Sequence, residues 1–95
     1  MKQYELWLAN LNPSKETEAG KIRPVVVIQS NLLNQVDHPS TLVCPITSLL
    51  SSSENILRVR MSKGKFGLDK DSEILVDQIR VLDNRRFLDK IGTIA

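Results

Sequence analysis

The sequence predicts a small, mainly β protein built as a single domain over residues 1–95. A chain of this length has room for only one hydrophobic core. Apolar residues recur in several short runs separated by turn-forming residues, and helical periodicity is scarce. Short strands at such regular spacing are typical of a small antiparallel β-barrel or sandwich.

The first two expected strands flank a long polar segment. Residues 4–11 alternate in polarity, which indicates a half-buried strand. Residues 12–22 are polar, and a loop of this length in a compact barrel is a candidate functional loop. Residues 24–29 contain the unbroken apolar run Val25–Ile28, which predicts a central strand covered on both faces.

The middle of the chain predicts a helical turn and a third strand. Residues 30–34 read as one turn of helix, because Ser30 or Asn31 can accept the first free backbone N–H groups. Residues 41–47 form the next expected strand. Pro45 has no backbone N–H to donate to a ladder, so we expect a sheet edge or a bulge there.

The C-terminal half predicts three more strands. Residues 57–61 alternate and indicate a half-exposed strand, and residues 62–71 form a turn region. Residues 73–82 read as a strand whose apolar phase slips by one residue at Asp77-Gln78. We expect a β-bulge or a bend there, which would aim these two side chains out of the sheet. Residues 87–94 suggest a last short strand.

Composition excludes several classes of protein. The longest apolar run, Val25–Ile28, is far too short to cross a membrane, and the N-terminus lacks the apolar stretch of a signal peptide. Cys44 is the only cysteine, which excludes an intrachain disulfide and fits a cytoplasmic protein with a buried structural thiol rather than a reactive one. A net charge of +2 permits nucleic-acid binding without arguing for it.

The usual catalytic groups are scarce. One histidine, one cysteine and scattered carboxylates do not match the ligand spacings of a metal site, and no Gly-rich phosphate loop follows a strand, so we expect no metal and no cofactor. His38 lies in a turn-rich segment and reads as a solvated side chain rather than a catalytic one. An enzyme built on this chain would therefore work without the usual bases.

Polar residues at strand ends remain as candidates. Arg23, Thr47, Asp77 and Gln78 would converge on one side of a barrel if their strands were neighbours. The alternative interpretation is structural: Arg23 forms a surface ion pair, Thr47 is a strand-end hydroxyl, and Asp77 is a charged residue that keeps a sheet edge from pairing with another chain.

Four segments resemble the signature of the MazF/PemK toxins, in the same order and at similar separations: Glu5–Leu8, Ile22–Ile28, Pro45–Thr47 and Asp77–Asp83. An Arg-Pro pair before a β-branched run is common alone. The combination of this pair with a strand ending in Thr and with an Asp-Gln-Ile-Arg strand is specific to the family. The resemblance covers essentially the whole chain.

The resemblance implies an SH3-like barrel of the MazF/Kid/CcdB type, which dimerises and binds RNA in a groove along the dimer. Arg23 and Thr47 match the catalytic Arg and Thr of the family. The implied substrate-binding residues are Thr17, Glu18, Asp77 and Gln78.

The implied activity is that of a toxin endoribonuclease that cleaves single-stranded RNA (mRNA) sequence-specifically. The 2′-OH of the RNA would attack the adjacent phosphorus without a metal, leaving 2′,3′-cyclic phosphate and 5′-OH ends, and a cognate antitoxin would neutralise the enzyme.

The chain departs from the family pattern at three places. Lys21 stands two residues before Arg23, where the family usually has Gly. Leu75 stands where some members have an Arg. Family members normally continue into a C-terminal helix, whereas this sequence ends at Ala95, so we expect that helix to be absent.

Two rival functions stay open at this stage. One is a non-enzymatic SH3-like toxin or binding module acting on a protein target such as DNA gyrase, since this scaffold does not fix function. The other is an RNA-binding domain without cleavage. A pocket shared by Arg23 and Thr47 would favour the nuclease, whereas burial of Arg23 in a structural ion pair would favour the rivals.

Overall fold

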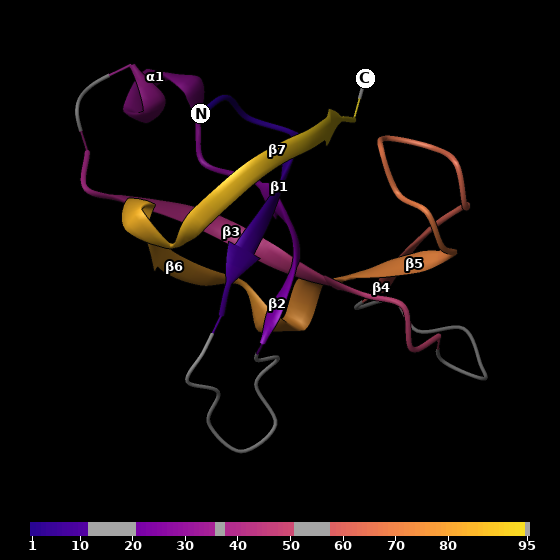
Figure 1. Ribbon diagram of the computed structural model, residues 1–95. Coiled ribbons are helices and arrows are strands. Elements are labelled where there is room, and N and C mark those ends of the chain that lie inside the picture. The colour runs from indigo at the N-terminus through magenta and orange to yellow at the C-terminus, as the bar shows by residue number, and fades with distance from the viewer. Residues whose placement is uncertain (12–20, 36–37, 51–57, 95) are drawn as a thin grey trace.

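The computed structural model describes residues 1–11, 21–35, 38–50 and 58–94. Within these ranges the chain forms seven strands, one single-turn helix and two 3-10 turns (Figure 1). In chain order they are β1 (Glu5–Asn10), β2 (Ile22–Val27), α1 (Asn31–Asn34), β3 (Ser40–Thr47), β4 (Arg58–Met61), β5 (Ser72–Leu75), η1 (Val76–Gln78), β6 (Arg80–Asp83), η2 (Asn84–Arg86) and β7 (Phe87–Thr93). The expected mainly β architecture is confirmed. Among the described residues, no helix has the length and apolar character needed to cross a lipid bilayer.

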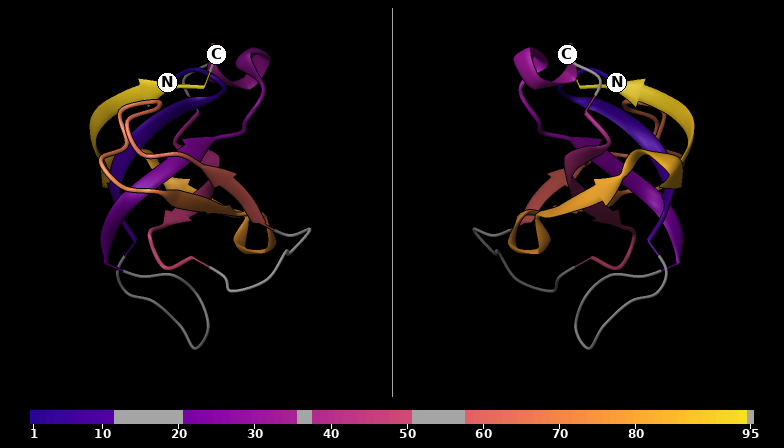
Figure 2. Two further views of the ribbon diagram at one scale, coloured as in Figure 1. Left: turned by 90° about the vertical axis from the view of Figure 1, so that its right-hand side faces the viewer. Right: turned by 90° about the vertical axis from the view of Figure 1, so that its left-hand side faces the viewer.

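All strand pairs are antiparallel, and the strands follow the order β4-β5-β3-β2-β1-β7, with β6 also paired to β3. The two side views show a strongly twisted sheet that curls round on itself (Figure 2). The expected helical turn is confirmed, because the Ser30 hydroxyl accepts a hydrogen bond from the backbone N–H of Leu32 and caps α1.

Strand β3 is the centre of the sheet. It pairs with β2 along one edge, and along the other edge it pairs first with β6, over Ser40–Val43, and then with β5, over Ile46–Thr47. The expectation of a sheet edge at Pro45 is therefore wrong. The proline lies instead where the second edge changes partner from β6 to β5, so its missing N–H coincides with an interruption between two ladders.

The phase slip at Asp77-Gln78 divides one expected strand into two. The chain leaves β5 at Leu75, makes the turn η1, and re-enters the sheet as β6 at Arg80. The break is a full 3-10 turn rather than a single-residue bulge, and it carries the chain from one β3 ladder to the next. Asp77 is exposed on this turn and Gln78 is half-buried.

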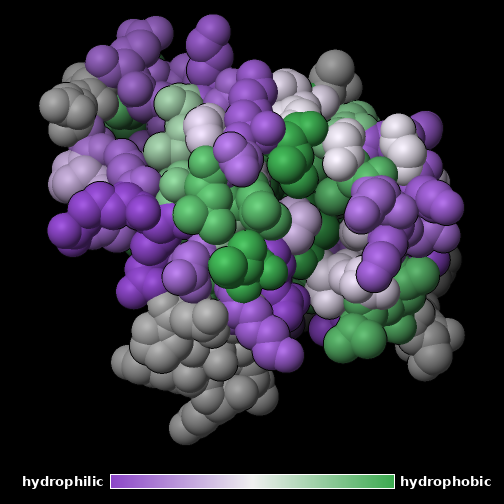
Figure 3. Space-filling model, viewed as in Figure 1, coloured by the Kyte–Doolittle hydropathy of each residue, from purple (hydrophilic) through white to green (hydrophobic). Residues whose placement is uncertain are grey.

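Two apolar clusters cover the two faces of β2. Val26 packs in one cluster with Leu6, Cys44 and Ile46, whereas Val25 and Val27 pack in the other. Residues that alternate along a strand point to opposite faces. The central position of this strand, buried on both sides, is thereby confirmed. Figure 3 shows apolar surface at the centre of one face, over the region where β1, β2 and β3 cross in Figure 1.

The turn at residues 62–71 is fastened to β7 by a close approach of two backbones. Gly67 has φ +83, and a Cβ there would overlap the carbonyl oxygen of Ile91. A Cβ on Gly92 would in turn overlap the carbonyl oxygen of Phe66. Only glycine lets the chains come this close, so both positions are fixed by the packing of the turn against the last strand.

Candidate functional site

Arg23 and Thr47 meet in one pocket at the end of the β2–β3 ladder. Val25 lies opposite Pro45, and continuing this register by two residues brings Arg23 to the level of Thr47. Both residues line an open pocket of ≈ 410 Å³. The sequence separates these residues by more than twenty positions, and it is the antiparallel pairing that unites them.

The hydroxyl of Thr47 is oriented by its own turn. The residue is 9% exposed, and its Oγ1 accepts a hydrogen bond of 3.1 Å from the backbone N–H of Leu49. This bond occupies one lone pair of the oxygen and leaves the hydroxyl hydrogen as a donor. Thr47 is therefore able to donate to an anionic ligand in the pocket.

Most of the charged side chains that line the pocket are positive. Lys21, Arg23 and Lys70 contribute cations to its lining, and Asp69 contributes one carboxylate. Among the described lining residues, three positive charges against one negative charge favour an anionic ligand such as a phosphate.

Lys21 adopts a backbone conformation that glycine prefers. Its φ is +67, in the left-handed region, and its carbonyl accepts a hydrogen bond of 2.8 Å from Leu11 N–H, which joins the two ends of the 12–20 segment. This is the position where the resemblance leads us to expect Gly. The backbone conformation is present although the residue is lysine, at a cost in strain.

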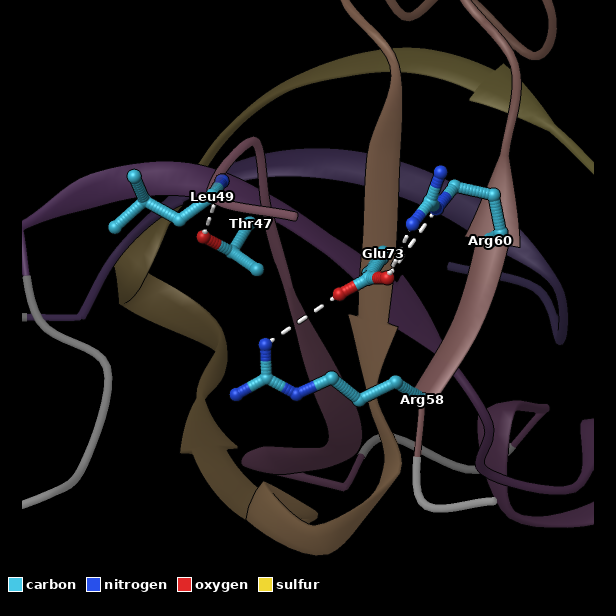
Figure 4. Close-up of polar contacts among 5 residues, drawn as sticks. All are labelled: Thr47, Leu49, Arg58, Arg60 and Glu73. Atoms are coloured by element: carbon cyan, nitrogen blue, oxygen red, sulfur yellow. Dashed lines mark hydrogen bonds and ion pairs between the residues drawn. The ribbon is translucent and has the colours of Figure 1, made fainter. Parts of the chain in front are cut away.

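A row of polar side chains continues from Thr47 across two more strands. Thr47 on β3 pairs with Glu73 on β5, and Glu73 pairs with Arg60 on β4. Directly paired residues share one face of a sheet. Figure 4 shows the carboxylate of Glu73 between the guanidinium groups of Arg60 and Arg58, with Thr47 on the neighbouring strand.

Sequence reasoning missed this cluster. The alternation in residues 57–61 does put Arg58 and Arg60 on one side of a strand, but nothing in the pattern indicates which strand lies beside it. The register of β4 against β5, which sets Arg60 opposite Glu73, supplies the missing information.

Asp77 and Gln78 lie outside the Arg23–Thr47 pocket. They sit on η1, which packs against β3 and β4, and neither lines that pocket. The expected convergence therefore holds for Arg23 and Thr47, whereas the Asp-Gln pair occupies a separate position beside β3. Thr17 and Glu18 fall outside the described residues.

The two groups that the sequence set aside from catalysis lie away from the pocket. His38 is exposed, and its Nδ1 is 2.7 Å from the carbonyl oxygen of Ser40. Cys44 is buried in the first apolar cluster, and desolvation raises the pKa of its thiol, as expected of a structural cysteine. Within the described ranges, no group of three His, Cys, Asp or Glu side chains is placed to hold a metal ion.

A family model described as PemK-like, MazF-like toxin of type II toxin–antitoxin system matches residues 2–95 of the sequence. The chain belongs to this family. Among curated relatives of the family, the chain is 40% identical over 91 residues to endoribonuclease MazF of Staphylococcus saprophyticus, an alignment that covers 96% of this chain and 75% of the relative.

Solved structures of MazF toxins share the fold. MazF from Deinococcus radiodurans matches with a TM-score of 0.80 at 24% identity, covering 100% of this chain and 82% of the other. The Mycobacterium tuberculosis toxin MazF-mt6 matches with a TM-score of 0.78 at 19% identity, covering 96% and 80%. The expected barrel-like MazF fold is confirmed, and the resemblance to MazF/PemK toxins with it.

Proposed function

We propose that this chain is a toxin endoribonuclease that cleaves single-stranded RNA at the pocket shared by Arg23 and Thr47. That shared pocket is the observation that carries the proposal, because it joins a guanidinium and an oriented hydroxyl in a member of the MazF-like family. The relative from Staphylococcus saprophyticus, named an endoribonuclease, supports the same activity.

The reaction uses the nucleophile that RNA itself carries. The 2′-OH attacks the adjacent phosphorus, the bond to the 5′-oxygen breaks, and the products are a 2′,3′-cyclic phosphate and a 5′-OH. The enzyme must align the two oxygens and stabilise the extra negative charge on the phosphorus. Arg23 suits this charge because a guanidinium presents forked donors to phosphate oxygens, and Thr47 donates its hydroxyl to the same group.

Proton transfer needs further groups. Arginine stays protonated in proteins, so Arg23 serves as an electrostatic clamp on the phosphate and neither accepts nor gives up a proton, and water supplies the proton of the leaving 5′-oxygen. Because Asp77 lies outside the Arg23–Thr47 pocket, Glu18 and water are the candidates for the base, and Asp77 is proposed to contact the RNA beside the pocket. Gln78 and Thr17 are proposed to contact bases and sugar, since unpaired bases expose the edges that such side chains read.

An antitoxin and a second copy of the chain are the proposed protein partners. The basic lining of the pocket suits an acidic, extended antitoxin segment as well as RNA. Exposed large apolar side chains, among them Leu49, Ile79 and Val81, supply surface for a homodimer. We place the activity in the cytoplasm, where single-stranded mRNA is found.

The rival functions are a toxin of the same scaffold that acts on a protein and an RNA-binding domain without cleavage. The deciding experiment replaces one sugar of an RNA oligonucleotide by its 2′-deoxy form, on the 5′ side of the cut. We expect cleavage of the parent in EDTA, because Arg23 and Thr47 supply the charge stabilisation, and none of the modified strand. Cleavage of the deoxy strand would point to attack by water, and an uncut parent would favour the two rivals, which binding of the uncut parent strand would separate.

A further inference from the structure

Among the described residues outside the pocket, Arg58, Glu73 and Arg60 form a cluster in which two arginines share one carboxylate. Arg60 donates to Oε2 of Glu73 through Nε at 3.2 Å and Nη2 at 3.1 Å, and Arg58 donates to Oε1 through Nη1 at 3.4 Å. The Glu73 side chain is only 4% exposed, whereas those of Arg58 and Arg60 are 27% and 53% exposed. A buried carboxylate thus holds two partly exposed guanidinium groups in fixed positions.

The cluster carries more positive charge than the carboxylate requires. One arginine would neutralise Glu73, so the second leaves an excess of one positive charge within these three residues. Arg60 directs two of its five N–H donors at Glu73, and about half of its side chain meets solvent. Nε of Arg58 is buried and meets no acceptor among the described residues. Arg60 therefore has exposed donor capacity beyond its bonds to Glu73, and Arg58 adds a second positive charge on a side chain that is 27% exposed.

The position of the cluster relative to Thr47 suggests its ligand. Glu73 lies one strand from Thr47 and Arg60 lies two strands away, on the same face. Neighbouring strands are about 4.8 Å apart, so Arg60 stands roughly 10 Å from Thr47 across the sheet. If the scissile phosphate of a single-stranded RNA binds Arg23 and Thr47, a neighbouring phosphate of that RNA would lie along the row from Thr47 through Glu73 to Arg60.

We propose that Arg58 and Arg60 form a second phosphate subsite, which binds the backbone of the RNA beside the scissile phosphate. Glu73 is the positioning residue of the subsite: it holds the two guanidinium groups and does not touch the substrate. This subsite rests on the proposed function. A phosphodiester is favoured over an acidic peptide because the row leads directly into the Arg23–Thr47 pocket.

The test compares Arg60→Gln with Arg85→Gln in the full chain. Both variants lose one arginine. Arg85 lies on η2, is 90% exposed and pairs with Asp83 at the end of β6, away from the pocket. Arg85→Gln therefore controls for the change in overall charge. The substrate is a single-stranded RNA oligonucleotide that the wild type cuts once. For Arg60→Gln we expect KM to rise about tenfold, because a charge-assisted contact is lost, and the single-turnover rate at saturation to stay within about twofold.

Salt dependence separates a phosphate contact from a structural role. Each phosphate contact on a single strand contributes a slope of about 0.7 to the dependence of log KM on log salt, so Arg60→Gln should lower this slope by about that amount. Arg60→Lys should keep most of the slope, because it retains the charge. Arg85→Gln should match the wild type in both KM and slope.

Three outcomes decide the matter. Equal KM and slope in Arg60→Gln and Arg85→Gln would overturn the subsite while leaving the nuclease in place. Unchanged RNA kinetics with weakened inhibition by an acidic antitoxin peptide would reassign the cluster to the antitoxin, and would overturn the proposal too. If the wild type cuts no RNA, the proposed function fails, and the affinity and salt slope of Arg60→Gln for an uncleavable 2′-deoxy strand still decide the subsite. Because Arg60 is half-exposed, its variants should fold, and thermal melts check this.

Discussion

Thr47 and Glu73 face each other across the β3–β5 ladder, so the hydroxyl of the candidate site and the carboxylate of the arginine cluster share one face of the sheet. Both side chains are almost fully buried. Their pairing links two groups of functional candidates that lie far apart in the sequence.

Removing the guanidinium of Arg23 should abolish most activity. We expect Arg23→Ala to lower the single-turnover cleavage rate on the order of 10²-fold or more, because the charge acts mainly on the transition state. The measurement is cleavage of a defined oligonucleotide, with circular dichroism to show that the fold is retained. Arg85→Ala is the control for charge. A folded Arg23→Ala variant with wild-type turnover would contradict the site.

Replacing Thr47 tests its hydroxyl. Thr47→Val keeps the shape of the side chain but loses both the donor and the acceptor of the Leu49 N–H bond. We expect a fall in rate smaller than that of Arg23→Ala, on the order of tenfold, as for a neutral hydrogen-bond donor. Thr47→Ser keeps the hydroxyl and should recover most of the activity. Wild-type activity in Thr47→Val would contradict a role for the hydroxyl.

Neutralising Glu73 should cost stability. Glu73→Gln removes the buried anion shared by Arg58 and Arg60, and because both guanidinium groups still reach solvent, the expected cost is that of a lost charged hydrogen bond, about 1.5–3 kcal/mol. Chemical denaturation measures the free energy of unfolding. Arg85→Gln breaks an exposed pair and should leave the unfolding curve unchanged. Equal stability of Glu73→Gln and the wild type would mean that Glu73 does not hold the arginines in solution.

Glycine at position 21 should stabilise the protein. Because Lys21 sits at φ +67, Lys21→Gly relieves a left-handed backbone and should add roughly 0.5–1 kcal/mol. Lys21→Ala is the matched control, since it removes the same charge but keeps the strain. Thermal melts of the two variants give the difference. If Lys21→Ala stabilises as much as Lys21→Gly, the gain comes from the charge and not from the backbone.

Acid should weaken the fold through Glu5. Burial opposes ionisation of this carboxyl, but hydrogen bonds from Lys2 N–H and Trp7 Nε1 and the ion pair with Lys90 outweigh it and lower its pKa from 4.5 to about 2. Its stabilisation is therefore complete above about pH 4.5 and is lost as the pH falls towards 2.

The measurement for Glu5 is the free energy of unfolding at pH 3 and pH 7. We expect Glu5→Gln to be less stable at pH 7 by roughly 2 kcal/mol and to lose less stability than the wild type on acidification. Parallel pH profiles for the two proteins would show that another group governs the acid transition.

The sequence predicted most of the strands because their polarity patterns are local. The unbroken run at Val25–Ile28 predicted a strand with two buried faces, and the phase slip at Asp77-Gln78 predicted a bulge or bend at the place where the structure has a 3-10 turn between two strands. The edge at Pro45 was wrong because a proline also fits a place where a central strand changes partner, and a pattern within one strand does not reveal its neighbours.

The candidate site divides in the same way. The resemblance supplied Arg23 and Thr47, and the β2–β3 pairing brings them into one pocket. The cluster around Glu73 was out of reach because it depends on register: a shift of β4 by one residue would turn Arg58 and Arg60 to the opposite face.

The contact between Gly67 and Gly92 also has a kinetic consequence. It fastens the turn at residues 62–71 to β7, and β7 pairs with β1 from the opposite end of the sequence. Contacts of such long range close slowly, so refolding in milliseconds to seconds is expected rather than the microseconds of small helical proteins. During synthesis the turn at residues 62–71 is fastened only after β7 has left the ribosome, so the fold is completed late in translation.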